Sequence, residues 1–185
     1  MDSSIDMSKS QKPKAKKLKL VETLTISNDD YESINIQKPF IKWAGGKRDI
    51  LSSIVTKFPI EINNYREIFL GGGSVLFALL CLNKAGKIKI KGNIYAYDIN
   101  EVLINTYKSI QSNRIELFNE LDKLKKKYHS LTGETINRKP KTIEESETSQ
   151  ESYYYWIRNK FNNSEKDTIE TSAMFIFLNK TCFRG

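Results

Sequence analysis

The chain has 185 residues, a net charge of +8 and 39% apolar residues, which suits one hydrophobic core with appended segments. Its longest apolar run, residues 75–82, is far shorter than the roughly 20 residues that span a bilayer, so we expect an intracellular protein without a membrane segment. A single histidine and two well-separated cysteines argue against a metal site, a disulfide framework and a Ser-His-Asp triad.

The first 37 residues are polar and lack sustained periodicity, which predicts a flexible basic tail over 1–37. Lysines gather around Pro13: Lys9, Lys12, Lys14, Lys16, Lys17 and Lys19. Such a cluster fits a nuclear address, a nonspecific nucleic-acid arm or a solubilising tail. We therefore expect a cytoplasmic location, or a nuclear one if the cluster acts as an address.

Residues 38–112 alternate between strand and helix patterns. Residues 51–58 carry apolar side chains at helical spacing, and residues 66–70 form a short apolar strand candidate that runs into three glycines and an apolar helix from Val75. Residues 94–97 predict a second strand, followed by a helix that reaches Ile110. This order predicts an α/β fold with a doubly wound parallel sheet that has helices on both faces.

Residues 113–185 have a different character. Helical periodicity continues to Leu124, a polar stretch from 125 to 150 predicts a loop or insertion, and apolar content returns at 153–156 and 173–178. The aromatic run 153–156 favours packing over base stacking. We expect the final third of the chain to pack as a mostly helical region.

The glycine turn and Asp98 form the most informative site pattern. Gly71 and Gly73 lie between a strand and a helix, where a backbone without side chains can approach a ligand. Asp98 ends the next strand, where a carboxylate can accept hydrogen bonds from ribose hydroxyls. The third glycine of a dinucleotide motif would fall at Leu76, so a nucleoside-type ligand fits better than a pyrophosphate. An empty tight turn and a helix-capping role for Asp98 are the alternatives.

The segment that ends in Gly45-Gly46-Lys47 invites comparison with a phosphate-binding loop. Arg48 stands where that motif needs Ser or Thr, and Ile41 stands where it needs glycine, so we reject a nucleotide triphosphatase. Lys47 can still pair with a ligand carboxylate, and Trp43 can form an apolar wall. The alternative is a surface lysine and a core tryptophan.

Four blocks in this order resemble the Dam-type DNA adenine methyltransferases: residues 38–47, 67–74, 97–100 and 177–185. The first block, with its Lys-Trp-Ala-Gly-Gly-Lys string, is the most specific to that family. The chain has Ile68 where the family usually has proline, which should affect the rigidity of the strand end more than ligand chemistry.

The resemblance implies a Rossmann-like methyltransferase sheet over residues 38–112 and the start of a DNA-recognition region over 113–185. It implies S-adenosylmethionine as cofactor, double-stranded DNA as partner and methyl transfer to the exocyclic amine of adenine. The implied cofactor contacts are Trp43, Lys47, Phe69, Gly71, Gly73 and Asp98. The implied DNA contacts are Lys180, Phe183 and Arg184.

Members of that family are also expected to carry an Asp-Pro-Pro-Tyr-like motif that holds the target amine. The four prolines, Pro13, Pro39, Pro59 and Pro140, include no Pro-Pro pair, so no catalytic residue can be named. We expect a truncated chain or a second polypeptide that supplies the motif, and little activity from this chain alone. The alternatives are a noncatalytic DNA-binding or cofactor-binding pseudoenzyme and, from the generic sheet and glycine turn only, a nucleotide-binding oxidoreductase.

Overall fold

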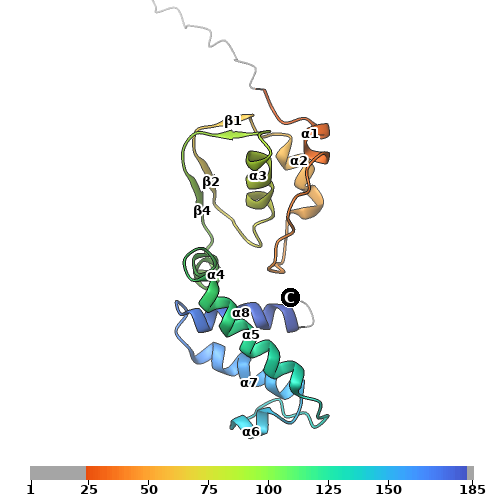
Figure 1. Ribbon diagram of the computed structural model, residues 1–185, viewed down its shortest axis with the longest axis vertical. Coiled ribbons are helices and arrows are strands. Elements are labelled where there is room, and N and C mark those ends of the chain that lie inside the picture. Colours follow the sequence, from red (N-terminus) through yellow and green to blue (C-terminus); the bar gives the residue numbers. More distant parts are fainter. Residues whose placement is uncertain (1–23, 183–185) are drawn as a thin grey trace, which may run out of the picture.

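A computed structural model describes residues 24–182, and it arranges them as an α/β part above a helical part (Figure 1). The α/β part contains the four strands with α1 (Asn28–Glu32), α2 (Leu51–Val55) and α3 (Ser74–Lys84). A short 3₁₀ helix, Arg48–Ile50, leads directly into α2. Residues 24–37, which the sequence predicted as part of a flexible tail, are folded onto the α/β part, because Ile26 is buried in its core and Ser27 caps α1.

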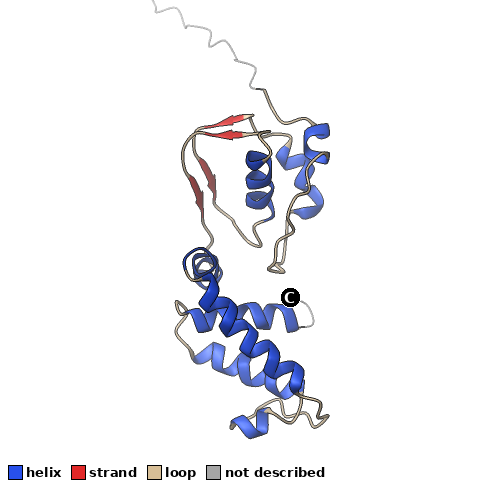
Figure 2. Ribbon diagram, viewed as in Figure 1, coloured by secondary structure: helices blue, strands red, loops and turns tan. Residues whose placement is uncertain are grey.

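The strands form two short parallel pairs (Figure 2). In the first, β1 (Glu61–Ile62) pairs with β3 (Lys89–Ile90), and in the second, β2 (Tyr65–Glu67) pairs with β4 (Ile94–Ala96). The second pairing continues beyond the strands, since the Leu70 N–H donates to the Tyr97 carbonyl at 2.8 Å. Helix α3 connects the two members of each pair, as parallel strands require a crossover.

The first hydrophobic core lies where α2 and α3 pack against the β1–β3 pair. Val55, Leu79 and Leu82 are fully buried there. The sequence predicted α2 from its apolar spacing and α3 from its continuous apolar run, although α2 ends at Val55 instead of reaching Phe58. This core fixes the helix that follows the glycine turn.

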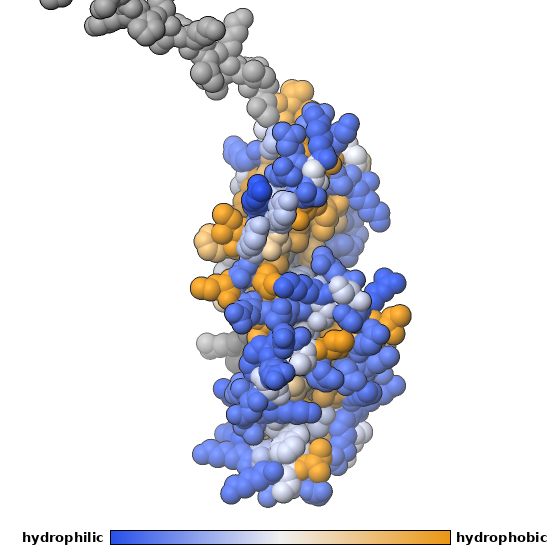
Figure 3. Space-filling view, turned by 90° about the vertical axis from the view of Figure 1, so that its left-hand side faces the viewer, coloured by the Kyte–Doolittle hydropathy of each residue, from blue (hydrophilic) through white to orange (hydrophobic). Residues whose placement is uncertain are grey.

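Among the described residues, much of the β2–β4 pair and of the residues that follow each strand is exposed to solvent. Ile68 and Phe69 are 64% and 77% exposed, and Ile94, Tyr95 and Tyr97 are exposed as well. Apolar side chains also gather over the α/β part in the view of Figure 3, whereas the helical part is mostly hydrophilic on that face. Parallel sheets usually bury both faces, so this small sheet exposes an unusual amount of apolar surface.

The helical part consists of four longer helices and one short one. Its members are α4 (Glu101–Ser112), α5 (Arg114–Ser130), α6 (Ile143–Ser146), α7 (Gln150–Asn163) and α8 (Ile169–Thr181). Helix α8 packs against α4, α5 and α7. Because it has neighbours on several sides, it buries Thr171 and Ser172 as well as Ala173, Met174 and Phe177. The predicted packing of the final third is thus observed.

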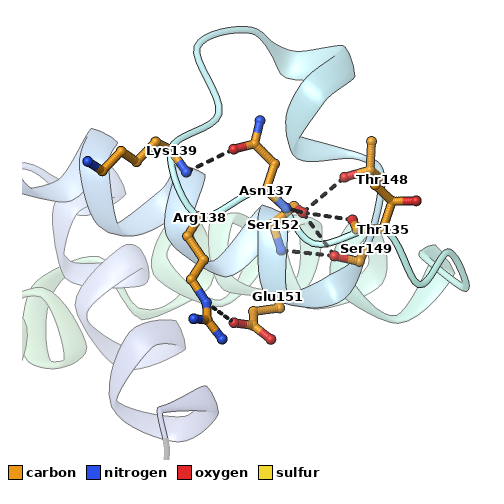
Figure 4. Close-up of polar contacts among 8 residues, drawn as sticks. All are labelled: Thr135, Asn137, Arg138, Lys139, Thr148, Ser149, Glu151 and Ser152. Carbon is orange, nitrogen blue, oxygen red and sulfur yellow. Dashed lines mark hydrogen bonds and ion pairs between the residues drawn. The ribbon is translucent and has the colours of Figure 1, made fainter.

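The polar stretch 125–150 differs in part from the predicted loop, because α5 runs on to Ser130. Ion pairs between residues one turn apart on α5 stabilise this lysine-rich end, for example the pair between Lys126 Nζ and Asp122 Oδ2 at 2.7 Å. Figure 4 shows how the remaining segment is attached to α7. The buried Ser152 hydroxyl accepts a hydrogen bond from the Asn137 N–H at 2.7 Å and donates to the Thr135 carbonyl at 3.2 Å. The insertion is therefore anchored to the helical part.

No helix within residues 24–182 has both the length and the apolar character needed to cross a membrane.

Candidate cofactor site

The glycine turn between β2 and α3 depends on two left-handed backbones. Gly71 has φ +50° and Gly73 has φ +80°, a region that residues with a Cβ rarely adopt. A Cβ at Gly71 would also lie 3.0 Å from the Trp43 side chain, and one at Gly73 would lie 2.9 Å from the Tyr107 hydroxyl. That hydroxyl donates to the Gly72 carbonyl at 2.9 Å, which holds the turn against α4. Glycine is required here by conformation and by space.

The Asp98 carboxylate joins the glycine turn to the end of the neighbouring strand segment. Its Oδ2 accepts from the Gly71 N–H at 2.8 Å, and its Oδ1 accepts from the Asn100 N–H at 3.0 Å. The cap of α4 is Asn100, whose side chain accepts from the Leu103 N–H at 2.9 Å. The capping alternative for Asp98 is thus wrong. Each carboxylate oxygen keeps a second lone pair for another donor.

A cavity of about 450 Å³ opens between the glycine turn, the end of β4 and the loop after residue 42. Five of the six residues that the sequence predicted as cofactor contacts line it: Trp43, Lys47, Phe69, Gly71 and Asp98. Gly73, the sixth, is buried beside Tyr107 and supports the turn without lining the cavity. The tertiary structure therefore brings together segments that are up to 55 positions apart in sequence, from Trp43 to Asp98.

The loop that carries Trp43 and Lys47 is fixed to the helical part. Asn179 of α8 accepts from the Lys42 N–H at 2.9 Å and donates to the Lys42 carbonyl at 2.8 Å. Trp43 packs edge-on against Phe175, with ring centroids 6.4 Å apart. These contacts hold the indole against the glycine turn. Trp43 is therefore a wall of the cavity and also packs against a second hydrophobic core, whose buried members are Ile41, Leu103, Leu117, Ala173 and Ile176.

Glu67 is a cavity residue that the sequence did not single out. Its side chain is buried, and burial raises its pKa, while a hydrogen bond from the Tyr65 hydroxyl at 3.2 Å and the charge of Lys47 act in the opposite direction. A buried carboxylate that faces a cavity can receive a cationic ligand group. Its position at the end of a strand, within the block 67–74, was the available signal.

Two exposed apolar side chains stand at the same cavity. Ile99 is 99% exposed and Phe69 is 77% exposed, and both line it. Exposed apolar groups that line the same cavity as a carboxylate are suited to a flat aromatic ring. Phe69 was predicted, whereas Ile99 was not, because a lone isoleucine after an aspartate carries no sequence signal by itself.

The predicted DNA contacts are only partly described. Lys180 is exposed in the last turn of α8, while Phe183, Arg184 and the lysine cluster around Pro13 lie outside the described residues. In the aromatic run, Tyr153 is 6% exposed and packs edge-on against Phe177, which agrees with the packing interpretation. Within residues 24–182 no group of three or more His, Cys, Asp or Glu side chains is placed to hold a metal ion.

The comparison with known families identifies the family of the chain. The model of the D12 class N6 adenine-specific DNA methyltransferases matches residues 43–185. The chain belongs to this family. The match includes the cavity residues from Trp43 to Asn100, so the geometry above is that of a D12 class methyltransferase.

Named relatives agree with the D12 class assignment. The chain is 39% identical over 155 residues to the type II methyltransferase M.MjaIII of Methanocaldococcus jannaschii, a match that covers 80% of this chain and 47% of the relative. It is 30% identical over 149 residues to the DNA N-6-adenine-methyltransferase of Escherichia phage P1, covering 80% and 16%. It is 28% identical over 151 residues to the DNA adenine methylase of Haemophilus influenzae, covering 80% and 42%. The chain thus spans less than half the length of these relatives.

Proposed function

We propose that this chain forms the S-adenosylmethionine-binding part of a site-specific DNA adenine methyltransferase. The observation that carries the proposal is the cavity in which Gly71, Asp98, Trp43 and Lys47 meet. Family membership supports it, because D12 class members are adenine-specific DNA methyltransferases. The strands of this part would belong to a Rossmann-like sheet. The solvent exposure of Ile68 and its neighbours is consistent with further strands or helices that pack against this sheet.

The residues of the cavity fit the chemical groups of this cofactor. The free lone pairs of Asp98 would accept from the ribose hydroxyls, and Phe69 with Ile99 would enclose the adenine ring. The absence of a Cβ at Gly71 leaves the turn open to close approach. Lys47 would hold the carboxylate of the methionine part, while Glu67 is placed to receive a positive group.

S-Adenosylmethionine, when bound, supplies an electrophilic methyl group. The contribution of this chain is to fix the donor in one orientation and to shield it with the Trp43 wall, so that a reacting amine would meet the methyl group in line. The sequence contains no Asp-Pro-Pro-Tyr-like segment, so none of these residues is proposed to hold the target amine. The cavity residues would bind the cofactor, and Lys180, Phe183 and Arg184 would contact DNA.

Calorimetric titration with S-adenosylmethionine and with adenosine tests this proposal. The wild-type chain should bind both, and the Lys47→Met substitution should weaken only the ligand that has a carboxylate, by about tenfold. Arg48→Met is the matched control, because Arg48 is exposed next to Lys47 and does not line the cavity. Failure of the folded wild type to bind S-adenosylmethionine would reject the proposal.

Electrophoretic mobility shifts with double-stranded DNA separate the proposal from a noncatalytic module. Cofactor-dependent DNA binding would support a methyltransferase, because the two ligands share one reaction. Salt-sensitive DNA binding by a chain that does not bind S-adenosylmethionine would instead indicate a DNA-binding pseudoenzyme.

A further inference from the structure

A second hollow of about 380 Å³ lies next to the cofactor cavity. It is formed by the loop after residue 41 together with α7 and α8, and it shares Trp43 and Ala44 with the first cavity. The two spaces therefore adjoin at this loop. Anything held in the second hollow would lie beside the cofactor.

The charged residues of the second hollow all have the same sign. Lys42 and Arg158 line it, and no aspartate or glutamate does. Neither cation takes part in any of the six ion pairs found among the described residues. The two positive charges of the hollow are therefore free of a carboxylate partner among the described residues, and they lie together at one surface where an anion from outside can reach them.

The walls of the hollow are apolar, which strengthens the effect of these charges. Phe161 and Phe175 stack with centroids 6.2 Å apart, and Leu178 lies beside them. A cleft with charges of one sign and low-dielectric walls concentrates the electric field and attracts counter-ions. Tyr154 and Asn162 add neutral hydrogen-bonding groups at the same surface.

The hollow is also built from fixed elements. The loop that carries Lys42 is attached to α8 by the two hydrogen bonds between the Lys42 backbone and Asn179. Arg158 follows Tyr154 by one helical turn on α7, within a helix that is packed against α8. A binding surface on packed helices keeps its geometry better than one on free loops.

We infer that the second hollow binds a backbone phosphate of the DNA strand that enters the cofactor site. This inference rests on the proposed function. The forked guanidinium of Arg158 would hold the phosphate oxygens, and Lys42 would add a second charge. Phosphate contacts fix the register of a duplex on a protein, so this one would place a nearby nucleotide at the cofactor cavity.

The test compares two substitutions that each remove one positive charge from α7. Arg158→Gln changes the hollow, whereas Lys160→Gln changes an exposed residue of the same helix that does not line it. Binding of a short fluorescein-labelled duplex to the full chain is followed by fluorescence anisotropy at about 50 and 200 mM salt. Calorimetric titration with S-adenosylmethionine and circular dichroism are recorded for every variant.

Arg158→Gln should weaken DNA binding by about tenfold or more, and Lys160→Gln by only about twofold. Lys42→Gln should act in the same direction as Arg158→Gln on DNA binding. Arg158→Gln and Lys160→Gln should both bind S-adenosylmethionine like the wild type. Equal effects of Arg158→Gln and Lys160→Gln would overturn the inference while the proposed function stands.

Two further outcomes would also overturn it. One is the absence of DNA binding by a wild-type chain that binds S-adenosylmethionine. The other is a result in which inorganic phosphate stabilises the folded wild type but not Arg158→Gln, while both bind DNA equally well. That result would identify the hollow as a site for a small anion. Loss of S-adenosylmethionine binding in the wild type would instead count against the proposed function.

Discussion

Asp98 accepts a hydrogen bond from the Gly71 N–H at 2.8 Å, so the carboxylate predicted to bind ribose also holds the glycine turn in place. The two residues stand at the ends of neighbouring parallel strand segments. One side chain thus positions the glycine turn and, in the proposed function, also binds the ligand, so its removal should affect both the turn and the affinity.

Asp98→Ala should reduce the affinity for S-adenosylmethionine by about 10- to 100-fold, because hydrogen bonds to a charged group contribute about 1.5–3 kcal/mol. Calorimetric titration measures the loss. Asp98→Asn should fall in between, since the amide oxygen can still accept from one backbone N–H. Glu101→Gln is the control for a lost charge nearby, as Glu101 is exposed and lies outside the cavity. An unchanged affinity of Asp98→Ala for S-adenosylmethionine would show that Asp98 does not contact this ligand.

Gly73→Ala should destabilise the chain more than Gly86→Ala does. Both positions have positive φ, so each alanine carries a conformational cost of about 1–2 kcal/mol. Only at Gly73 would the new Cβ also meet another group, the Tyr107 hydroxyl at 2.9 Å, whereas nothing lies within 4 Å at Gly86. Urea unfolding should show at least about 1 kcal/mol of additional loss for Gly73→Ala. Equal losses would mean that Tyr107 moves aside freely.

Asn179→Ala should lower the free energy of unfolding by about 2–4 kcal/mol. It removes two hydrogen bonds and leaves the N–H and carbonyl of Lys42 without their partner. Affinity for S-adenosylmethionine should fall as well, because the loop with Trp43 and Lys47 loses its attachment to α8. Urea unfolding and calorimetry report the two effects.

The control for this change is Asn119→Ala, because Asn119 is exposed on α5 and makes no side-chain hydrogen bond within the described part of the chain. Its unfolding free energy should stay within about 0.5 kcal/mol of the wild type. A similar small change in Asn179→Ala would show that the loop is held by the Trp43 packing alone.

Glu67→Gln should become progressively more stable than the wild type as pH rises. Burial raises the pKa of Glu67 above its ordinary value of 4.5, so the folded state binds this proton more tightly than the unfolded state. The wild type therefore loses stability as pH rises from the ordinary pKa through the raised one, and glutamine removes that loss. Unfolding free energies measured across this range report the difference.

Glu61→Gln provides the opposite sign. Lys91 lowers the pKa of Glu61, so the wild type gains stability as pH rises through the lowered pKa to the ordinary one, and the variant should lack that gain. A pH dependence of Glu67→Gln with the same sign as that of Glu61→Gln would contradict a buried carboxylate at position 67.

The sequence by itself determined several of the local elements and most of the residues that line the cavity. A continuous apolar run marked α3, and helical spacing marked α4. The adjacent glycines marked the turn, because a left-handed backbone is a property of single residues. Trp43, Lys47, Phe69, Gly71 and Asp98 were named from their motifs, and all five line one cavity.

Only the tertiary structure decided which contacts these residues make. The bond from Gly71 to Asp98, the attachment of Lys42 to Asn179 and the burial of Glu67 join segments that are far apart in sequence or depend on packing from several elements. The same holds for the order of residues 24–37, where a polar segment is fixed because Ile26 enters a core made by other elements. Local patterns report the preferences of the chain, whereas burial and long-range hydrogen bonds arise only when separate segments meet.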